Sequence, residues 1–131
     1  MHAQAEVIAR FLVTAFFAVV FLQSAYDKLT DRQGNIAFFS DHFKNSPLAA
    51  VVPLLFWVLT LAELSAGALC ALGILSGSFV ARGFGIAACG VALSGVALLC
   101  LLTGQRLAKD YAGAAVVAAY FAVALLGLGF F

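Results

Sequence analysis

The chain has 131 residues, of which 65% are hydrophobic and only 10% are charged, whereas ordinary soluble domains carry about 25% charged residues. So few charges cannot cover a water-exposed surface, so the composition excludes a soluble fold and predicts a protein that lies in lipid. The net charge is +1 and the basic residues form no run, which leaves no electrostatic basis for binding nucleic acid. The length allows one domain, residues 1–131.

Four apolar segments are long enough to cross a bilayer, which takes about 20 residues in a helix. They are Val7–Tyr26, Pro53–Leu75, Gly83–Leu102 and Tyr111–Phe131. A backbone in lipid has to satisfy its own hydrogen bonds, and the alternating polarity of a membrane β-barrel is missing from these segments. The sequence therefore predicts an all-α fold, an integral membrane four-helix bundle.

The long connection between the first and second spans contains Ile36, Phe39 and Phe43 at helical spacing, with Asp41 and Lys44 available for a polar side. This pattern predicts a short amphipathic helix at the membrane interface that ends near residue 47. A plain polar loop is the alternative.

Basic residues near the ends of the spans predict the orientation in the membrane. With four spans, both termini share a side with the turn after the second span, and the basic residues of that side are Arg10 and Arg82. The opposite side carries Lys28, Arg32, Lys44, Arg106 and Lys109. We therefore expect the two charged connections in the cytoplasm and both termini outside. Arg10 and Arg82 are expected to extend to the lipid headgroups.

The third and fourth spans are rich in small residues, which let helices approach closely in lipid. Gly90 and Ser94 lie four residues apart in the third span. One face of the fourth span carries Ala115, Ala118, Ala119 and Ala122. Both patterns indicate close helix packing in a compact bundle.

Glu63 is the most informative polar residue because it lies near the middle of the second span. A charge at that depth costs about 2.5–3.5 kcal/mol on insertion scales, so the side chain must face the bundle. Arg10 and Arg82 start from the opposite end of the bundle, too far for direct contact with Glu63. We therefore expect Glu63 to be a neutral carboxylic acid that is hydrogen-bonded to a neighbouring helix. Gly67 and Cys70 share its face and leave room for a helix or a ligand. Three roles for Glu63 remain open: a proton site, a polar anchor of a ligand pocket, and a buried strut that hydrogen-bonds between helices.

A second group of candidate site residues lies at the expected cytoplasmic side. Its members are Gln23, Asp27, Lys28, Arg106, Lys109 and Asp110. They could form one polar network at a mouth of the bundle, or each could be an ordinary interfacial anchor.

No residue pattern identifies a catalytic centre, so whether the protein is an enzyme stays open. Cys70, Cys89 and Cys100 lie in apolar segments without a C-x-x-C pair, which indicates thiols that act as packing residues. Neither His2 nor His42 lies in a span, so histidine ligands for a membrane haem are missing. Metal-ligand spacing is also missing, and no cofactor is evident.

Several motifs, in order along nearly the whole chain, resemble the DoxX family of small four-helix bacterial membrane proteins. The first span begins with Arg10 and ends in FLQSAYDKL, with Ser24 and Lys28, and GNIAFFSDHF follows. The second span carries Glu63 in ELSAGALCALGIL, Arg82 opens the third, and QRLAKDYAGAA leads into the fourth. The sequence departs from the family in two places. The residue after Ser24 is alanine where glycine is common, and the Gly-Pro-Gly and Ser-Leu-Asp tail of many members does not follow GLGFF.

This resemblance implies a multi-pass protein of the bacterial cytoplasmic (inner) membrane. It implies a subunit or partner of a quinone-linked or redox-defence membrane system, since the family name derives from a subunit of a quinone-linked thiosulfate oxidoreductase. The expected ligand is then a quinone or lipid. The expected partners are the bilayer and other membrane or peripheral redox proteins, and an oligomer is possible.

Two other functions remain open. One is a small proton-coupled transporter, although the buried glutamate of small multidrug transporters lies in the first helix and Glu63 lies in the second span. The other is a structural or assembly factor of a membrane complex, in which Glu63 is a strut.

Overall fold

The computed structural model describes residues 2–131, and every regular element among them is helical. Four helices are long and apolar enough to cross a membrane. They are α1 (His2–Thr30), α3 (Val52–Leu75), α4 (Ile86–Leu107) and α5 (Tyr111–Leu128). The short α2 (Arg32–His42) and a 3-10 turn, η1 (Ala49–Val51), connect α1 to α3. The predicted all-α membrane bundle is confirmed, and the chain is a multi-pass membrane protein.

The spans differ from the predicted ones mainly at their ends. The first was expected over 7–26 and extends over 2–30, while α4 covers 86–107 instead of 83–102 and α5 ends at 128. Gly83 has φ +126°, which no right-handed helix accepts, so α4 begins after it. At the other end Lys109 has φ 60° and the Asp110 N–H donates to the Gln105 carbonyl at 2.9 Å, which closes the helix. Hydropathy shows which residues are apolar enough to lie in lipid, but it does not show the backbone angles at which a helix begins or ends.

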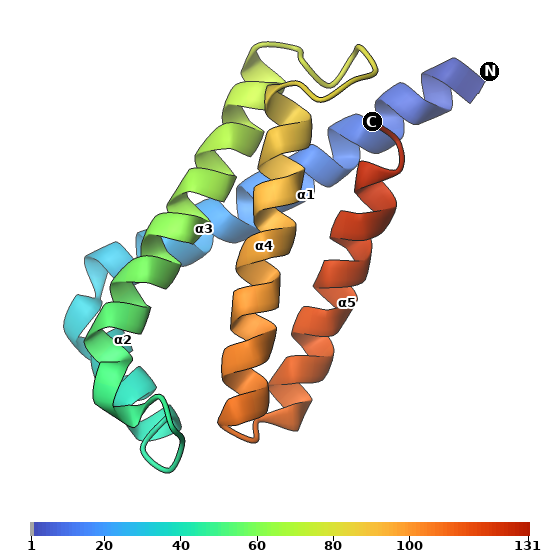
Figure 1. Cartoon of the computed structure of the whole chain (residues 1–131). Helices are drawn as coiled ribbons and strands as arrows, with labels where there is room; N and C mark the ends of the chain where they lie inside the picture. Colours follow the sequence, from blue (N-terminus) through green and yellow to red (C-terminus); the bar gives the residue numbers. More distant parts are fainter. Residues whose placement is uncertain (1) are drawn as a thin grey trace.

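Helix α1 crosses the bundle obliquely. Its 29 residues make it about 43 Å long, against an apolar bilayer thickness of about 30 Å. Figure 1 shows it passing behind α3 and α4 at a steep angle to both. Both termini lie at the end of the bundle that carries the α3–α4 connection, and the α4–α5 connection and the segment after α2 lie at the opposite end (Figure 1).

Helix α3 is in close contact with α1 on one side and α4 on the other. A Cβ atom on Gly67 would lie 2.9 Å from the backbone nitrogen of Leu22, and one on Gly90 would lie 2.7 Å from the backbone nitrogen of Cys70. The hydroxyl of buried Ser94 lies 3.8 Å from the Cys70 sulfur. The expected close packing at Gly90 and Ser94 is confirmed, because only small residues permit this approach.

Helix α5 does not pack through the face that the sequence indicated. The alanines expected to be packed are exposed, namely Ala115, Ala118, Ala119 and Ala122. The residues that α5 buries are Ala114, Val117, Ala124 and Gly127. Gly127 lies directly on Val13 of α1, where a Cβ would come 2.5 Å from the valine Cγ2. Because α5 is rich in small residues all round, its composition does not identify the packed side.

The predicted short helix between the first two spans is present as α2. It begins at the cap formed by Asp31, whose carboxylate accepts from the Gly34 N–H at 3.2 Å. It ends at His42, earlier than expected, and it packs on the start of α3 through Phe39 and Phe56, whose ring centroids are 5.9 Å apart. Helix α2 therefore covers the lower half of α3 in Figure 1.

Candidate functional site

A buried ion pair links the end of α1 to the middle of α3. The Nζ atom of Lys28 lies 3.3 Å from Oε1 and 3.3 Å from Oε2 of Glu63. The exposed fractions of the two side chains are 11% for Lys28 and 2% for Glu63. Lys28 also donates to the Ser24 hydroxyl at 2.8 Å, and its Nζ lies 5.9 Å from the centre of the Phe39 ring. Helices α1, α2 and α3 therefore meet at one charged contact.

This contact differs from the expected hydrogen bond between a neutral Glu63 and a neighbouring helix, because the partner of Glu63 is a basic side chain. The carboxylate does bond to a neighbouring helix, as expected, but its donor is an ammonium group. Two charges that leave water together are tolerated only when they pair at close range and their remaining hydrogen-bonding groups find partners. The Ser24 hydroxyl supplies one such partner. The pair can tie α1 to α3, and it is the only side-chain ion pair among residues 2–131 in which both side chains are almost fully buried.

The spacing of residues along α1 offers a sequence signal for this pair. The buried residues of α1 recur at helical spacing and lie on one face: Arg10, Val13, Thr14, Phe17, Ala18, Phe21, Ala25 and Lys28. Extending this spacing to the end of the helix places Lys28 on the packed face. A buried carboxylate in the next span needs a cation, and Lys28 is the cation that this periodicity offers.

A pocket of about 450 Å³ lies between α2, the first half of α3 and the last turns of α4. Much of its wall is apolar and partly aromatic, including Phe38, Phe39, Phe43, Leu55, Leu59 and Leu101. The ring of Phe39 belongs both to this wall and to the surroundings of Lys28. The ion pair therefore supports the helices that form the pocket.

Polar groups line part of the same pocket. His42 and Asp110 lie in its wall with Nε2 and Oδ2 3.7 Å apart, and Phe38 stacks on the His42 ring at 5.5 Å. Gln105 also lines it, and the amide Oε1 of Gln105 is buried without a hydrogen-bond donor anywhere in residues 2–131. An apolar cavity with a few convergent polar groups is the usual form of a site for a small organic molecule. The sequence did not indicate this pocket, because it depends on where α2 packs.

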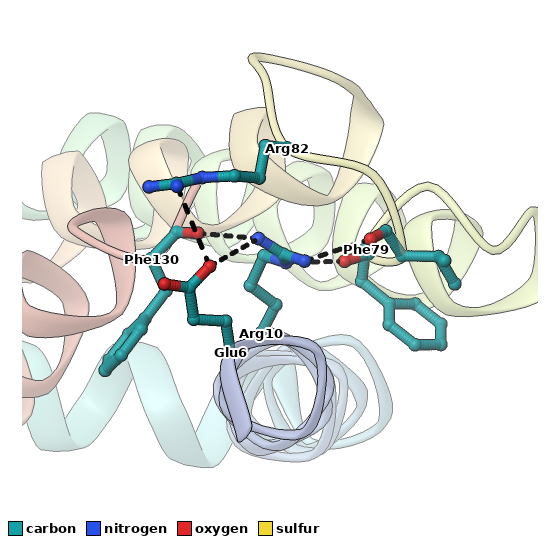
Figure 2. A network of polar contacts seen from close by, with 6 residues as sticks. Glu6, Arg10, Phe79, Arg82 and Phe130 are labelled. Carbon is teal, nitrogen blue, oxygen red and sulfur yellow. Dashed lines mark hydrogen bonds and ion pairs between the residues drawn. The ribbon is translucent and has the colours of Figure 1, made fainter. Parts of the chain in front are cut away.

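A second polar cluster lies at the opposite end of the bundle, around Arg10 (Figure 2). The guanidinium donates to the carbonyls of Phe79 at 2.8 Å, Val80 at 2.9 Å and Phe130 at 2.9 Å. Glu6 bridges two arginines, since its Oε2 lies 3.9 Å from Nη1 of Arg10 and 3.8 Å from Nη1 of Arg82. Arg10 therefore joins α1 to the α3–α4 connection and to the end of the chain after α5.

The expectation that Arg10 extends to the headgroups is wrong, because Arg10 is only 2% exposed and its donors are used inside the protein. The Arg82 side chain is 67% exposed, and the expectation that it extends to the headgroups stays a prediction.

The six candidates at the other end do not form one network. No side-chain hydrogen bond or ion pair joins any two of them within the described part of the chain, residues 2–131. Lys28 turns inward to Glu63, Gln23 and Asp27 are exposed on α1, and Lys109 is exposed at the end of α4. Arg106 stacks on the Tyr111 ring at 4.6 Å, and Asp110 caps α5 by accepting from the Gly113 N–H at 2.9 Å.

The cysteines are separate from one another. Cys70 is buried against α4, Cys89 is half-buried and Cys100 is exposed at the wall of the pocket. All three are free thiols. Within residues 2–131, no three His, Cys, Asp or Glu side chains gather as a metal site requires.

Comparison of the chain with protein-family models, with curated proteins and with solved structures finds no match.

Proposed function

We propose that this DoxX-like membrane protein holds a quinone-like lipid in the pocket between α2, α3 and α4, as a subunit or partner of a quinone-linked or redox-defence system of the bacterial inner membrane. The observation that carries the proposal is the pocket itself. Its volume of about 450 Å³ falls in the range of small-molecule sites.

The lining suits a flat ring that bears a few polar groups and an apolar tail. Phe38, Phe39 and Phe43 offer ring faces and edges for stacking. His42 and the amide of Gln105 can hydrogen-bond to carbonyl or hydroxyl groups on such a ring. The unsatisfied Gln105 oxygen is spare hydrogen-bonding capacity, and buried groups of this kind usually mark a missing partner.

The ion pair acts in this proposal as a strut. It holds α1 against α3 behind the Phe39 wall, so it preserves the pocket without taking part in proton or electron transfer. The proton-coupled transporter is less well supported, because the Glu63 carboxylate is already occupied by Lys28 and Ser24 completes the contact.

A soluble partner would approach the end of the bundle where the pocket lies. That end carries exposed basic groups on Arg32, Lys44, Arg106 and Lys109. Surface charge of this kind steers a partner and sets the rate of encounter more than it sets affinity. The partner would take up the quinone-like lipid from the pocket, or exchange electrons with it, at this face.

The test is the set of small molecules that co-purify with the protein in mild detergent, identified by mass spectrometry of an organic extract. We expect quinone in stoichiometric amounts with the wild type. Val58→Trp fills the pocket from α3 and should remove it, whereas Leu61→Trp is the matched control. Leu61 lies on the same helix with similar exposure, 60% against 55% for Val58, but outside the pocket lining.

Loss of quinone in both variants, or retention in both, would contradict the proposed site. Far-UV circular dichroism of each variant confirms that the helices are intact. A wild type that carries no quinone and that takes up none when reconstituted would overturn the quinone assignment.

A further inference from the structure

An apolar groove lies between α1 and α5, far from the pocket described above. Its volume is about 360 Å³, and all of its lining residues are apolar. On α1 the wall includes Leu12 and Phe16, and on α5 it includes Val123 and Leu126. Its base lies where Gly127 meets Val13 so closely that no larger residue fits. The groove is open to the surface, and Gly127 permits the close approach of α5 to α1 beside it.

The groove reaches the Arg10 cluster through Phe130. This residue lines the groove, and its carbonyl accepts from Arg10. The Gly83 N–H, next in sequence to Arg82, donates to the Phe131 carbonyl at 3.1 Å. Figure 2 shows the Glu6 carboxylate joined to both Arg10 and Arg82. Arg82 is the exposed member of the cluster. A basic group therefore stands at one end of an apolar channel.

The donors of the two arginines are used differently. Arg10 gives three hydrogen bonds to backbone carbonyls and is buried, so little of it is free for a ligand. Arg82 makes one polar side-chain contact within residues 2–131, the ion pair with Glu6 at 3.8 Å. A guanidinium carries five N–H donors, so most of those on Arg82 have no protein acceptor within residues 2–131. Two arginines and one glutamate leave a local charge of +1.

We propose that this groove is a binding site for an anionic phospholipid, with an acyl chain along α1 and α5 and the phosphate on Arg82. The apolar lining matches the chain, and the net positive charge at its end matches the headgroup. Arg10 is a positioning residue, because it fixes the 79–80 segment and the residue-130 carbonyl that frame the end of the groove.

The test measures lipid retention by native mass spectrometry of the detergent-solubilised protein. The probes are phosphatidylglycerol and phosphatidylcholine with identical acyl chains. One basic residue near a membrane surface contributes about fivefold in affinity for anionic lipid. We expect phosphatidylglycerol to be preferred about fivefold by the wild type, and we expect Arg82→Gln to abolish that preference. Arg32→Gln, an exposed arginine on α2 away from the groove, should keep it.

A second pair of variants tests the apolar part of the site. Val123→Trp fills the groove and should weaken retention of both lipids. Val116 lies two turns away on α5, is also exposed and does not line the groove. Val116→Trp should therefore leave the retention of both lipids unchanged. Thermal unfolding of all four variants confirms that they are folded.

Equal retention of the two lipids, or an unchanged preference in Arg82→Gln, would overturn the proposal. So would displacement of phosphatidylglycerol by inorganic phosphate at millimolar concentration, because it would show an anion site that does not use the groove.

Discussion

Replacing Glu63 with leucine should leave the Lys28 ammonium buried without its counter-ion. In the folded protein this ammonium lies 3.3 Å from both carboxylate oxygens, and the two side chains are 11% and 2% exposed. Removing one member of a buried ion pair typically costs 3–5 kcal/mol. Lys28 keeps the Ser24 hydroxyl at 2.8 Å, so we expect the lower end of that range, about 3 kcal/mol.

The opposite single change, Lys28→Met, leaves a carboxylate that is nearly inaccessible to water and should cost a similar amount. The double variant removes both charges, and apolar residues of similar volume in place of a buried pair are often neutral or stabilising. We therefore expect the double variant to lie within about 1 kcal/mol of the wild type, which gives a coupling energy of at least about 5 kcal/mol between the two sites. Glu63→Gln keeps an oxygen acceptor but loses the charge, so it should fall between the wild type and Glu63→Leu.

The measurement is reversible unfolding in mixed detergent and SDS micelles, followed by far-UV circular dichroism. The four members of the cycle are compared at one lipid composition and pH. Single variants within about 0.5 kcal/mol of the wild type, or a double variant whose cost is the sum of the two, would refute the strut.

Three further predictions concern other parts of the molecule. A reporter fused after Phe131 should lie outside the cytoplasm, since more basic residues flank the opposite side; a cytoplasmic reporter would reverse the orientation. Replacing all three cysteines with alanine should leave the helix content intact and lower the thermal midpoint only slightly, because the thiols are free and unpaired; loss of folding or of a redox phenotype would indicate a thiol mechanism. Gly90→Ala should destabilise the bundle by about 1–3 kcal/mol, since its Cβ would lie 2.7 Å from the Cys70 backbone, whereas Gly95→Ala, with its nearest neighbour at 3.7 Å, should be neutral or stabilising in thermal unfolding.

The spans could be predicted from the sequence because crossing a bilayer is a local requirement of length and hydrophobicity. The same argument predicted that Glu63 faces the bundle, which its burial confirms. The close helix packing at Gly90 and Ser94 also followed from local spacing, since small residues four apart mark a close helix crossing. Local patterns do not identify which residues of the other helices lie in contact.

The pairing of Lys28 with Glu63 depends on the oblique path of α1, which brings the end of one helix to the middle of another. Hydropathy placed Lys28 at the membrane surface because it follows an apolar segment. The burial of Arg10 is a similar case, because three carbonyls of distant segments converge on it only in the folded chain. The pocket depends on α2, whose weak amphipathic pattern predicts a helix and does not predict what the helix covers.

Photoaffinity labelling of the protein in native membranes with a quinone that carries a photoreactive ring tests the central claim most directly. Labelled peptides are mapped by mass spectrometry, and excess unlabelled quinone serves as the competitor. The proposed function predicts competable labels on the pocket segments 38–43, 55–62 and 100–105, and their loss in Val58→Trp. Labels confined to the α1–α5 groove, or spread evenly over the lipid-facing surface of all four spans, would contradict it.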